Sequence, residues 1–355
     1  MADRLKTYRE RRHAERTPEP VPKGRSRRRT KGDTFVIQQH HARRLHWDFR
    51  LERDGVLVSW AIPRGIPRDP KRNHLAVHTE DHPMEYADFA GEIPEGEYGA
   101  GKVTIYDKGT YETEKWLDDE VMVVLHGEGV SGRYVLFHTR DDDWMIHRMD
   151  PPDPTWQPMP EGLRPMLATH GSLPTGTGWG YEMLWNGVRA LGAVEGGRLT
   201  LTIEGGPEIT SSCPELRELA EELAPAECLL DGEIVAFSGG KLDPDLLKRR
   251  FGETDSARAR RLADRLPVTY LIYDLLYLDG TVLLDESYAD RRSRLEELGI
   301  GGDRWQVPPY FSGKGSAARQ TSREQGLPGV VAKRLTSTYQ PGKRSKDWRE
   351  IPHHR

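Results

Sequence analysis

Hydrophobic and polar positions in the first half of the chain alternate with the period of a β-strand. In the stretch LHWDFRLER (45–53), apolar side chains take the odd positions, and imidazole, carboxylate and guanidinium groups take the even ones. Because successive side chains of a strand point to opposite faces, this stretch predicts one apolar face and one polar face. The Asp-Gly pair at 54–55 then predicts a tight hairpin turn into a returning strand, VLVSWAIP (56–63).

Similar strand-like stretches recur up to residue 149, whereas the second half mixes strands with helices. Eight such stretches with turn residues between them predict a mostly-β, barrel-like domain over 32–149. The proline-rich stretch 150–164 breaks all periodicity and predicts a linker. Residues 165–355 combine strand patterns such as LLDGEIVAF with amphipathic patterns such as CPELRELAEELA, which predicts an α+β domain.

Charge is distributed unevenly along the chain. The net charge is −4, yet residues 1–31 hold twelve lysines and arginines against four acids, a net +8. A basic, proline-containing arm predicts disorder and attraction to phosphates, and a solubilising tail explains it equally well. No stretch approaches 18 apolar residues, and Cys213 and Cys228 have no metal or redox spacing. We therefore expect a cytoplasmic protein that does not cross a membrane.

Histidines are concentrated in the mostly-β half, where nine of the thirteen lie between residues 40 and 147. His40, His46 and Asp48 combine two imidazoles with a carboxylate, a set that can hold Mn²⁺, Fe²⁺ or Zn²⁺ and leave positions open for substrate. Arg50, on the same strand face, suits a bidentate grip on a phosphate. A metal, an arginine and a further histidine make a minimal set for phosphoryl transfer, although ordinary surface or core histidines explain the spacing about as well.

Two long stretches in this half resemble the 3′-phosphoesterase domain of bacterial DNA ligase D. They are QQHHARRLHWDFRLERDGVLVSWAIPRG and LAVHTEDHPMEYADFAGEIPEGEYGAGKV, and the resemblance covers nearly all of 34–149. It implies a Mn²⁺-dependent enzyme that removes 3′-terminal ribonucleotides and 3′-phosphates from DNA ends to leave a 3′-hydroxyl. The roles implied by the match are metal ligands for His40, His46 and Asp48, phosphate contacts for Arg50 and His82, and supporting positions for Glu80 and Tyr86.

Residues 165–355 resemble the adenylation (nucleotidyltransferase) domain of ATP-dependent DNA ligases. The stretches PMLATHG, YEMLWNGVRA, LLDGEIVAF, VTYLIYDLLYLDG and PGVVAKRLTSTYQPGKRSKDW occur in the family order. The resemblance implies a nucleotide pocket, and this sequence retains several of the family's pocket residues. The retained residues are Glu182, Arg189, Glu233, Tyr273 and Lys333.

The lysine nucleophile of that family is missing from this sequence. Ligases of this type attack ATP with a lysine amine to form lysyl-AMP, and the lysine of the Lys-x-Asp-Gly motif is Leu184 here. The family's metal-binding glutamate is Pro328, and its last two lysines fall in the stretch WREIP (348–352). We also expect the OB domain that usually follows this domain to be absent. We therefore expect a degenerate pseudo-ligase domain, with doubtful use of ATP and no ligation.

The sequence thus favours a DNA 3′-end phosphoesterase in double-strand-break repair, associated with the nucleoid. Its partners would be DNA ends and, at one further step of inference, Ku, a repair polymerase or a separate ligase. One alternative is an ATP-dependent DNA ligase, which predicts a covalent AMP adduct. The other is a non-catalytic DNA-end-binding accessory protein, which predicts salt-dependent binding and no end processing. The complete metal and phosphate set favours the phosphoesterase.

Overall fold

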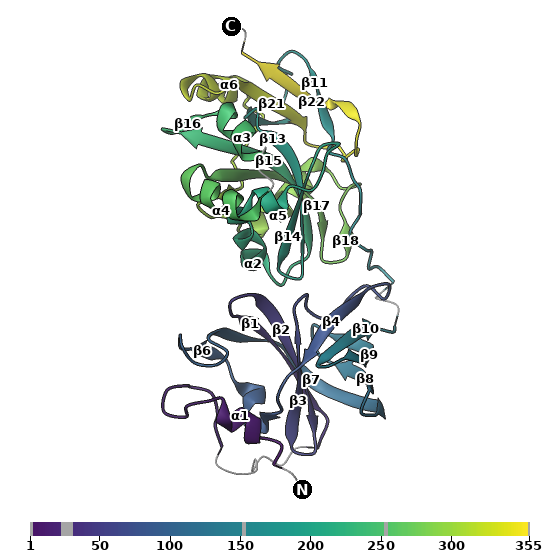
Figure 1. The fold of residues 1–355 in the computed structure, drawn as a ribbon. Coiled ribbons are helices and arrows are strands. Elements are labelled where there is room, and N and C mark those ends of the chain that lie inside the picture. The colour runs from purple at the N-terminus through teal and green to yellow at the C-terminus, as the bar shows by residue number, and fades with distance from the viewer. Residues whose placement is uncertain (1–2, 23–30, 151–153, 252–254, 354–355) are drawn as a thin grey trace. The chain divides into compact units, whose positions relative to one another are not determined.

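The computed structural model describes residues 3–22, 31–150, 154–251 and 255–353. The chain divides into two compact units, Met1–Pro154 and Thr155–Arg355, and this division falls inside the stretch predicted as a linker (Figure 1). Each unit has its own sheets and is described by itself. No helix among the described residues is long and apolar enough to span a membrane.

The first unit is built on a closed antiparallel barrel of eight strands. The strand order is β1-β2-β3-β4-β10-β9-β8-β7, and pairing of β7 with β1 closes the barrel. Two short strands attach to it, β5 to β3 and β6 to β7. This confirms the predicted mostly-β, barrel-like fold. The strands are β1 (Thr34–His41), β2 (Leu45–Arg53), β3 (Val56–Ile62), β4 (Asn73–His78), β5 (His82–Pro83), β6 (Gly91–Ile93), β7 (Gly101–Trp116), β8 (Glu120–His126), β9 (Ser131–Arg140) and β10 (Asp143–Arg148).

Both faces of β2 are buried, but against different partners. On the apolar face, Phe49 packs against the rings of Phe35 and Trp60. The polar face is covered rather than solvated, and Arg50 is only 2% exposed. Its cover comes from the short helix η1 (Met84–Asp88), whose Tyr86 ring lies 4.8 Å from the Arg50 guanidinium. A strand with a buried charged face requires partners for every charge, and this requirement shapes the site described below.

The prediction of a disordered basic arm is wrong for residues 3–22, and the rest of that arm lies outside the described residues except for Lys31. The segment contains helix α1 (Lys6–Glu10), and its Tyr8 is fully buried in an apolar cluster with residues of β1, β3 and η1. Arg12 pairs with Glu19 at 2.8 Å, and both are buried. The charge count misled because these basic residues find carboxylate partners within the fold, which composition does not reveal.

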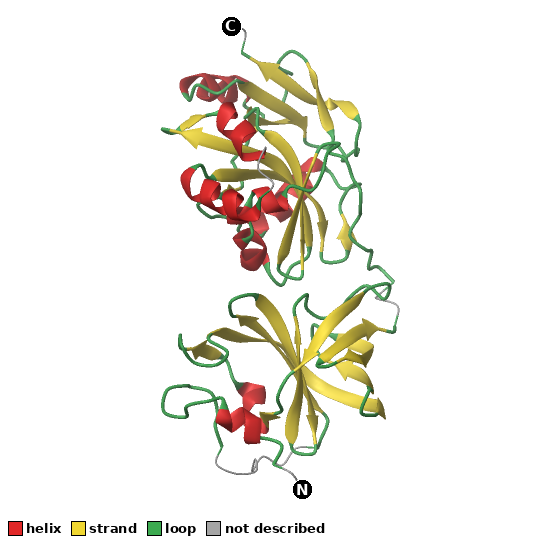
Figure 2. Ribbon diagram, in the orientation of Figure 1, coloured by secondary structure: helices red, strands yellow, loops and turns green. Residues whose placement is uncertain are grey.

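The second unit contains two sheets with helices against them, which confirms the predicted α+β domain (Figure 2). The larger sheet has the order β14-β13-β15-β17-β18, with β16 on β15 and β19 on β17, and the smaller has the order β11-β22-β21-β12-β20. The strands are β11 (Leu167–His170), β12 (Trp179–Leu184), β13 (Val188–Glu195), β14 (Arg198–Ile203), β15 (Cys228–Ser238), β16 (Lys241–Leu242), β17 (Val268–Leu278), β18 (Thr281–Val282), β19 (Trp305–Gln306), β20 (Phe311–Ser312), β21 (Gly329–Arg334) and β22 (Arg344–Pro352). The helices are α2 (Glu218–Leu223), α3 (Pro244–Phe251), α4 (Ser256–Arg265), α5 (Tyr288–Glu297) and α6 (Gly315–Glu324), with the short turns η2 (Thr210–Ser212) and η3 (Pro214–Leu216).

The chain passes from one sheet to the other immediately after Leu184. Strand β12 ends there in the smaller sheet, and β13 begins at Val188 in the larger one. Apolar helix faces hold the sheets in place: Leu219 and Leu295 pack in the core of the larger sheet, and Ala318 of α6 packs in that of the smaller. Leu184, which the resemblance places at the position of the nucleophile, therefore lies at the junction of the two sheets.

Candidate active site

The three predicted metal ligands meet on neighbouring strands of the barrel. His40 of β1 is paired directly with His46 of β2, and Asp48 follows two residues later on the same face. Nδ1 of His40 is 3.5 Å from one Asp48 carboxylate oxygen, and Nε2 of His46 is 3.7 Å from the other. One donor atom from each of the three residues lies within 4.8 Å of the others. The strand pairing thus produces a compact N,N,O donor set.

Each imidazole in this set is oriented by a backbone carbonyl on its far side. Nε2 of His40 donates to the carbonyl of Gly99 at 2.9 Å, and Nδ1 of His46 donates to the carbonyl of Arg44 at 3.0 Å. The other ring nitrogen of each histidine therefore lies on the side of Asp48. Metal-binding histidines are typically held in this way.

The carboxylate of this donor set is ionised. Burial of Asp48 opposes its ionisation, but the Arg50 guanidinium and the contact with His40 outweigh burial and hold the pKa of Asp48 below its usual range. Two imidazoles and an ionised carboxylate fit a Mn²⁺, Fe²⁺ or Zn²⁺ ion with open positions for substrate. The residues present therefore suit the metal that the sequence implies.

Arg50 joins this donor set to His82. Its Nη2 donates to Asp48 at 3.0 Å, its Nε donates to the Gln38 side-chain oxygen at 2.7 Å, and its Nη1 lies 2.9 Å from Nδ1 of His82. Burial and then the charges of Arg50 and Arg12 lower the pKa of His82 well below its usual range. His82 is therefore a neutral imidazole at neutral pH, and the positive charge of the site comes from the two arginines.

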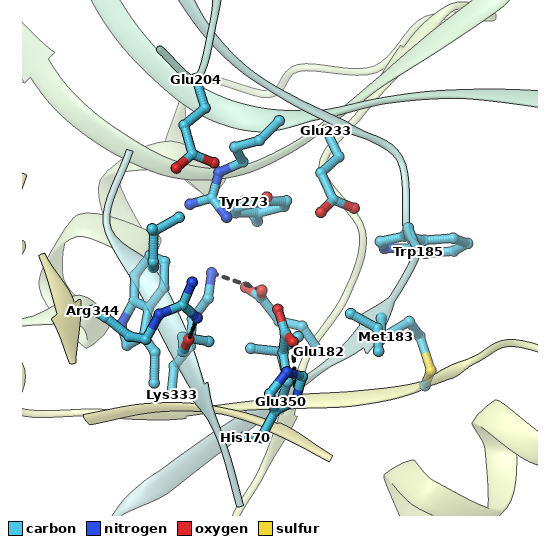
Figure 3. A pocket seen from close by; sticks show the side chains of 16 residues that line it. His170, Glu182, Met183, Trp185, Glu204, Glu233, Tyr273, Lys333, Arg344 and Glu350 are labelled. Carbon is cyan, nitrogen blue, oxygen red and sulfur yellow. Dashed lines mark hydrogen bonds and ion pairs between the residues drawn. The ribbon is translucent and has the colours of Figure 1, made fainter. Parts of the chain in front are cut away.

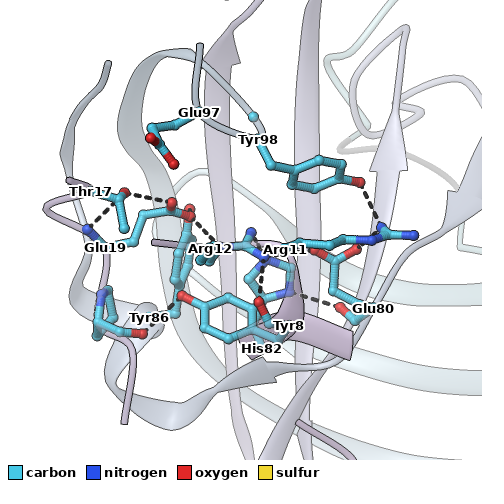
Figure 4. Close-up of polar contacts among 12 residues, drawn as sticks. Tyr8, Arg11, Arg12, Thr17, Glu19, Glu80, His82, Tyr86, Glu97 and Tyr98 are labelled. Atoms are coloured by element: carbon cyan, nitrogen blue, oxygen red, sulfur yellow. Dashed lines mark hydrogen bonds and ion pairs between the residues drawn. The ribbon is translucent and has the colours of Figure 1, made fainter. Parts of the chain in front are cut away.

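The N-terminal segment contributes residues that sequence reasoning missed (Figure 4). Arg12 lies 3.4 Å from Nε2 of His82 and also donates to Glu80 at 2.9 Å. Glu19 accepts from Arg12 at 2.8 Å and from the hydroxyl of Tyr86 at 3.1 Å. In the sequence these residues were only part of a basic arm. The useful signal was Tyr8, an aromatic residue in an otherwise polar segment, which anchors the segment beside the site.

The structure brings all seven predicted site residues of the first unit into one connected group. Glu80 accepts hydrogen bonds from Arg11 and Arg12 of the N-terminal segment, and the Tyr86 ring lies over the Arg50 guanidinium. The histidines assigned no role lie in other contacts. His74 bonds to the carbonyl of Gly65 at 2.7 Å, and His78 packs against Trp60 and Trp144.

The second unit holds a cavity of about 270 Å³ next to the strand junction. Figure 3 shows Tyr273 and Glu233 on one side of the hollow, with Lys333, Glu182 and Glu350 on the other. Every residue that the sequence assigned to a nucleotide pocket lines this cavity. These residues are Glu182, Arg189, Glu233, Tyr273 and Lys333, and Leu184, the predicted position of the missing nucleophile, lines the cavity as well.

Both units match known families at the residues just described. Residues 38–138 match the DNA Ligase D 3′-phosphoesterase domain, and residues 165–351 match the ATP dependent DNA ligase domain. The chain belongs to the LigD-like proteins. These matches confirm the two resemblances noted in the sequence, one for each unit.

Several relatives share both units of this LigD-like protein. A protein named "Multifunctional non-homologous end joining protein LigD" from Mycobacterium bovis is 46% identical over 99% of the chain, and its counterpart from Pseudomonas aeruginosa is 31% identical over 97%. The chain spans 46% of the length of each, about half of these curated relatives. The crystal structure of the ligase domain from M. tuberculosis LigD is 36% identical, with a TM-score of 0.47, covering 54% of this chain and 60% of that one.

In the LigD-like protein, two cations of the second-unit cavity, Lys333 and Arg189, are already paired with carboxylates, whereas Arg344 donates to the carbonyl of Ala168. Lys333 lies 2.7 Å from Glu182, and burial lowers the pKa of Lys333 although Glu182 opposes this. Arg189 makes a bidentate pair with Asp231, both bonds at 2.6 Å. Glu350, which stands where the resemblance places a lysine, lines the same cavity.

Proposed function

We propose that this LigD-like protein is a Mn²⁺-dependent phosphoesterase that acts on DNA 3′ ends. It would remove 3′-terminal ribonucleotides and 3′-phosphates and leave a 3′-hydroxyl. The observation that carries the proposal is the contact of Arg50 with both the candidate donor set and His82: Arg50 bonds to Asp48 at 3.0 Å and lies 2.9 Å from His82. The match of residues 38–138 to the 3′-phosphoesterase domain supports it.

The residues around Arg50 suit the stabilisation of charge on a phosphate. A divalent ion held by His40, His46 and Asp48 would supply Lewis-acid chemistry at a phosphate oxygen. Gln38 and the Tyr86 ring hold the Arg50 guanidinium in place, so it is oriented before substrate arrives. Because Arg50 is almost fully buried, its attraction to a phosphate is screened less than it would be in water.

Arg12 and His82 belong to the same group of buried side chains. Arg12 provides a second positive charge beside His82, and its pairing with Glu80 and Glu19 fixes its position. As a neutral imidazole, His82 offers a hydrogen bond or a proton site at the reacting oxygen without adding charge. This combination of two oriented cations and one neutral proton carrier suits hydrolysis of a phosphate ester.

The direct test is an assay on a primer-template that ends in a single 3′-ribonucleotide. With Mn²⁺, the wild type is expected to leave a shortened primer with a 3′-hydroxyl, and His40→Ala and Asp48→Ala are expected to leave the primer intact. His126→Ala, which alters an exposed histidine paired with Glu112, is the matched control and should keep full activity. Absence of trimming by folded wild-type protein with Mn²⁺ would refute the proposal.

We further propose that the second unit does not form lysyl-AMP. Leu184 lines the cavity without an amine, and Glu350 adds a negative charge to the region that must accept the ATP phosphates. Incubation with ATP and a divalent ion should therefore give no covalent AMP adduct. An adduct on the wild type would instead support the alternative of an ATP-dependent ligase. Restoration by Leu184→Lys would show that the pocket itself still binds ATP productively.

The biological setting is inferred from the relatives, which are named for non-homologous end joining. We propose that DNA ends in double-strand-break repair are the partners of this protein, in the cytoplasm and close to the nucleoid. Ku, a repair polymerase or a separate ligase would be further partners. Co-purification of these proteins on a broken DNA duplex, with and without the LigD-like protein, tests this setting.

A further inference from the structure

The loop between β6 and β7 is fixed against the metal donor set. The carbonyl of Gly99 accepts the hydrogen bond that orients His40. Gly101 has a φ of +139°, and a Cβ placed on it would lie 2.2 Å from the carbonyl oxygen of His41, so only glycine fits there. Tyr98 directly precedes Gly99, so its Cα lies about 3.8 Å from that of the residue whose carbonyl orients His40.

Tyr98 is an exposed aromatic residue that is nonetheless held in place. It is 47% exposed, although aromatic side chains usually bury most of their area. Its hydroxyl accepts a hydrogen bond from Arg11 at 2.8 Å, and the Arg11 guanidinium lies 4.8 Å from the ring centroid. Arg11 is itself tied to Glu80 at 2.8 Å (Figure 4). The ring is thus preorganised and accessible, and its position is not explained by packing in a core.

We propose that Tyr98 stacks on the nucleobase next to the scissile phosphate and so makes the site select nucleic-acid ends over other phosphate esters. This inference rests on the proposed phosphoesterase function. Base–aromatic stacking is tolerant of sequence, because every base has a π-face, and this suits an enzyme that must process arbitrary ends. The guanidinium on the ring adds a cation beside the stacked base.

The position of Tyr98 suits this role because a nucleobase is joined to its phosphate through one sugar. A ring that stacks on this base must therefore lie close to the metal donor set. Tyr98 lies close to the donor set because the next residue, Gly99, bonds to His40. Arg11, which contacts both Tyr98 and Glu80, also places the ring beside Glu80. The ring and the donor set together define a site of about one nucleotide.

The test compares two oligonucleotides that end in a 3′-phosphate, one with a normal terminal base and one with an abasic terminal sugar. For Tyr98→Ala, KM for the normal end should rise roughly 5- to 100-fold, the range typical of a lost stacking contact, with little change in kcat. KM for the abasic end should stay near the wild-type value. Tyr98→Phe and Tyr98→Trp, which keep a ring, should restore wild-type KM for the normal end.

Leu117→Ala, one residue beyond the far end of β7 and 50% exposed, is the matched control and should change neither KM. An unchanged KM in Tyr98→Ala would overturn the inference. So would an equal loss for both ends, because that result would indicate a merely structural role.

A binding measurement separates this inference from the proposed function. Fluorescence anisotropy of the same two oligonucleotides, recorded without divalent ions, needs no hydrolysis. If the wild type proves inactive, the phosphoesterase proposal fails, and the binding data alone decide the role of Tyr98. A base-dependent loss of affinity in Tyr98→Ala supports stacking, and a base-independent loss or no loss refutes it.

Discussion

The guanidinium of Arg50 has three different polar partners, and only a forked side chain reaches all of them. Its nitrogens contact Asp48, Gln38 and His82 at 3.0, 2.7 and 2.9 Å. A lysine offers a single ammonium in place of this planar fork. We therefore expect Arg50→Lys to lower kcat on a 3′-phosphate end by roughly 10²- to 10³-fold, as loss of an oriented transition-state donor does.

The control for this prediction is Arg53→Lys, on the same strand. Arg53 stacks on Trp116 rather than contacting the donor set, so this change should leave kcat near the wild-type value. A wild-type kcat in Arg50→Lys would show that charge alone suffices at this position and that the fork has no role.

Metal binding by the donor set is testable without any substrate. A ligand that binds only the folded state stabilises it by about 2.7 kcal/mol at a concentration one hundred times its Kd. We therefore expect Mn²⁺ to raise the Tm of the wild type, and we expect no such shift in His40→Ala, because the donor set then lacks one nitrogen. Differential scanning calorimetry with and without Mn²⁺ measures this. An equal shift in both proteins would place the ion elsewhere.

At the scale of single elements, the local patterns were the most predictive. The turn expected at 54–55 joins β2 to β3, and both of its residues have positive φ, as a tight hairpin requires. Alternation along β2 was also right about which residues share a face. It did not show that this face is buried, because the cover comes from η1 and from the N-terminal segment, which are distant in sequence.

The structure of the N-terminal segment differs more than that of any other element from what its composition predicts. Tyr8 is fully buried, and removal of a buried aromatic ring typically costs about 3–5 kcal/mol. We expect Tyr8→Ala to release this segment from the barrel and to expose the bond after Arg12 to trypsin. Limited proteolysis followed by mass spectrometry should show rapid cleavage there in Tyr8→Ala and slow cleavage in the wild type. Equally rapid cleavage in both would restore the interpretation as a disordered arm.

At the scale of the whole chain, motifs located both candidate sites, but contacts between distant segments did not follow from them. The order of the ligase-like motifs assigned six residues that line one cavity. Pairing of Arg189 with Asp231 and of Lys333 with Glu182 could not be read from those motifs, because each pair joins different strands. Closure of the barrel by β1 and β7 was equally hidden, since nothing local in either strand specifies the other.

These pairings lead to a prediction about the second unit. A triphosphate entering the cavity meets Lys333, which is already paired with Glu182, and it also meets Glu350, whose side chain is about one-third exposed and pairs with His170 at 3.5 Å. Glu350→Lys replaces a repulsive charge with an attractive one. At the effective dielectric of a partly buried site, this change should raise the affinity for ATP by about tenfold or more.

Adenosine carries no phosphate, so its affinity should be nearly the same in Glu350→Lys and in the wild type. Isothermal titration of both ligands into both proteins gives the comparison. The expected result is a gain in affinity confined to ATP. This would show that the charge of Glu350 weakens phosphate binding, in addition to the loss of the nucleophile at Leu184. Tight ATP binding by the wild type, with no gain in the variant, would mean that the pocket still accepts a triphosphate and that only the nucleophile is missing.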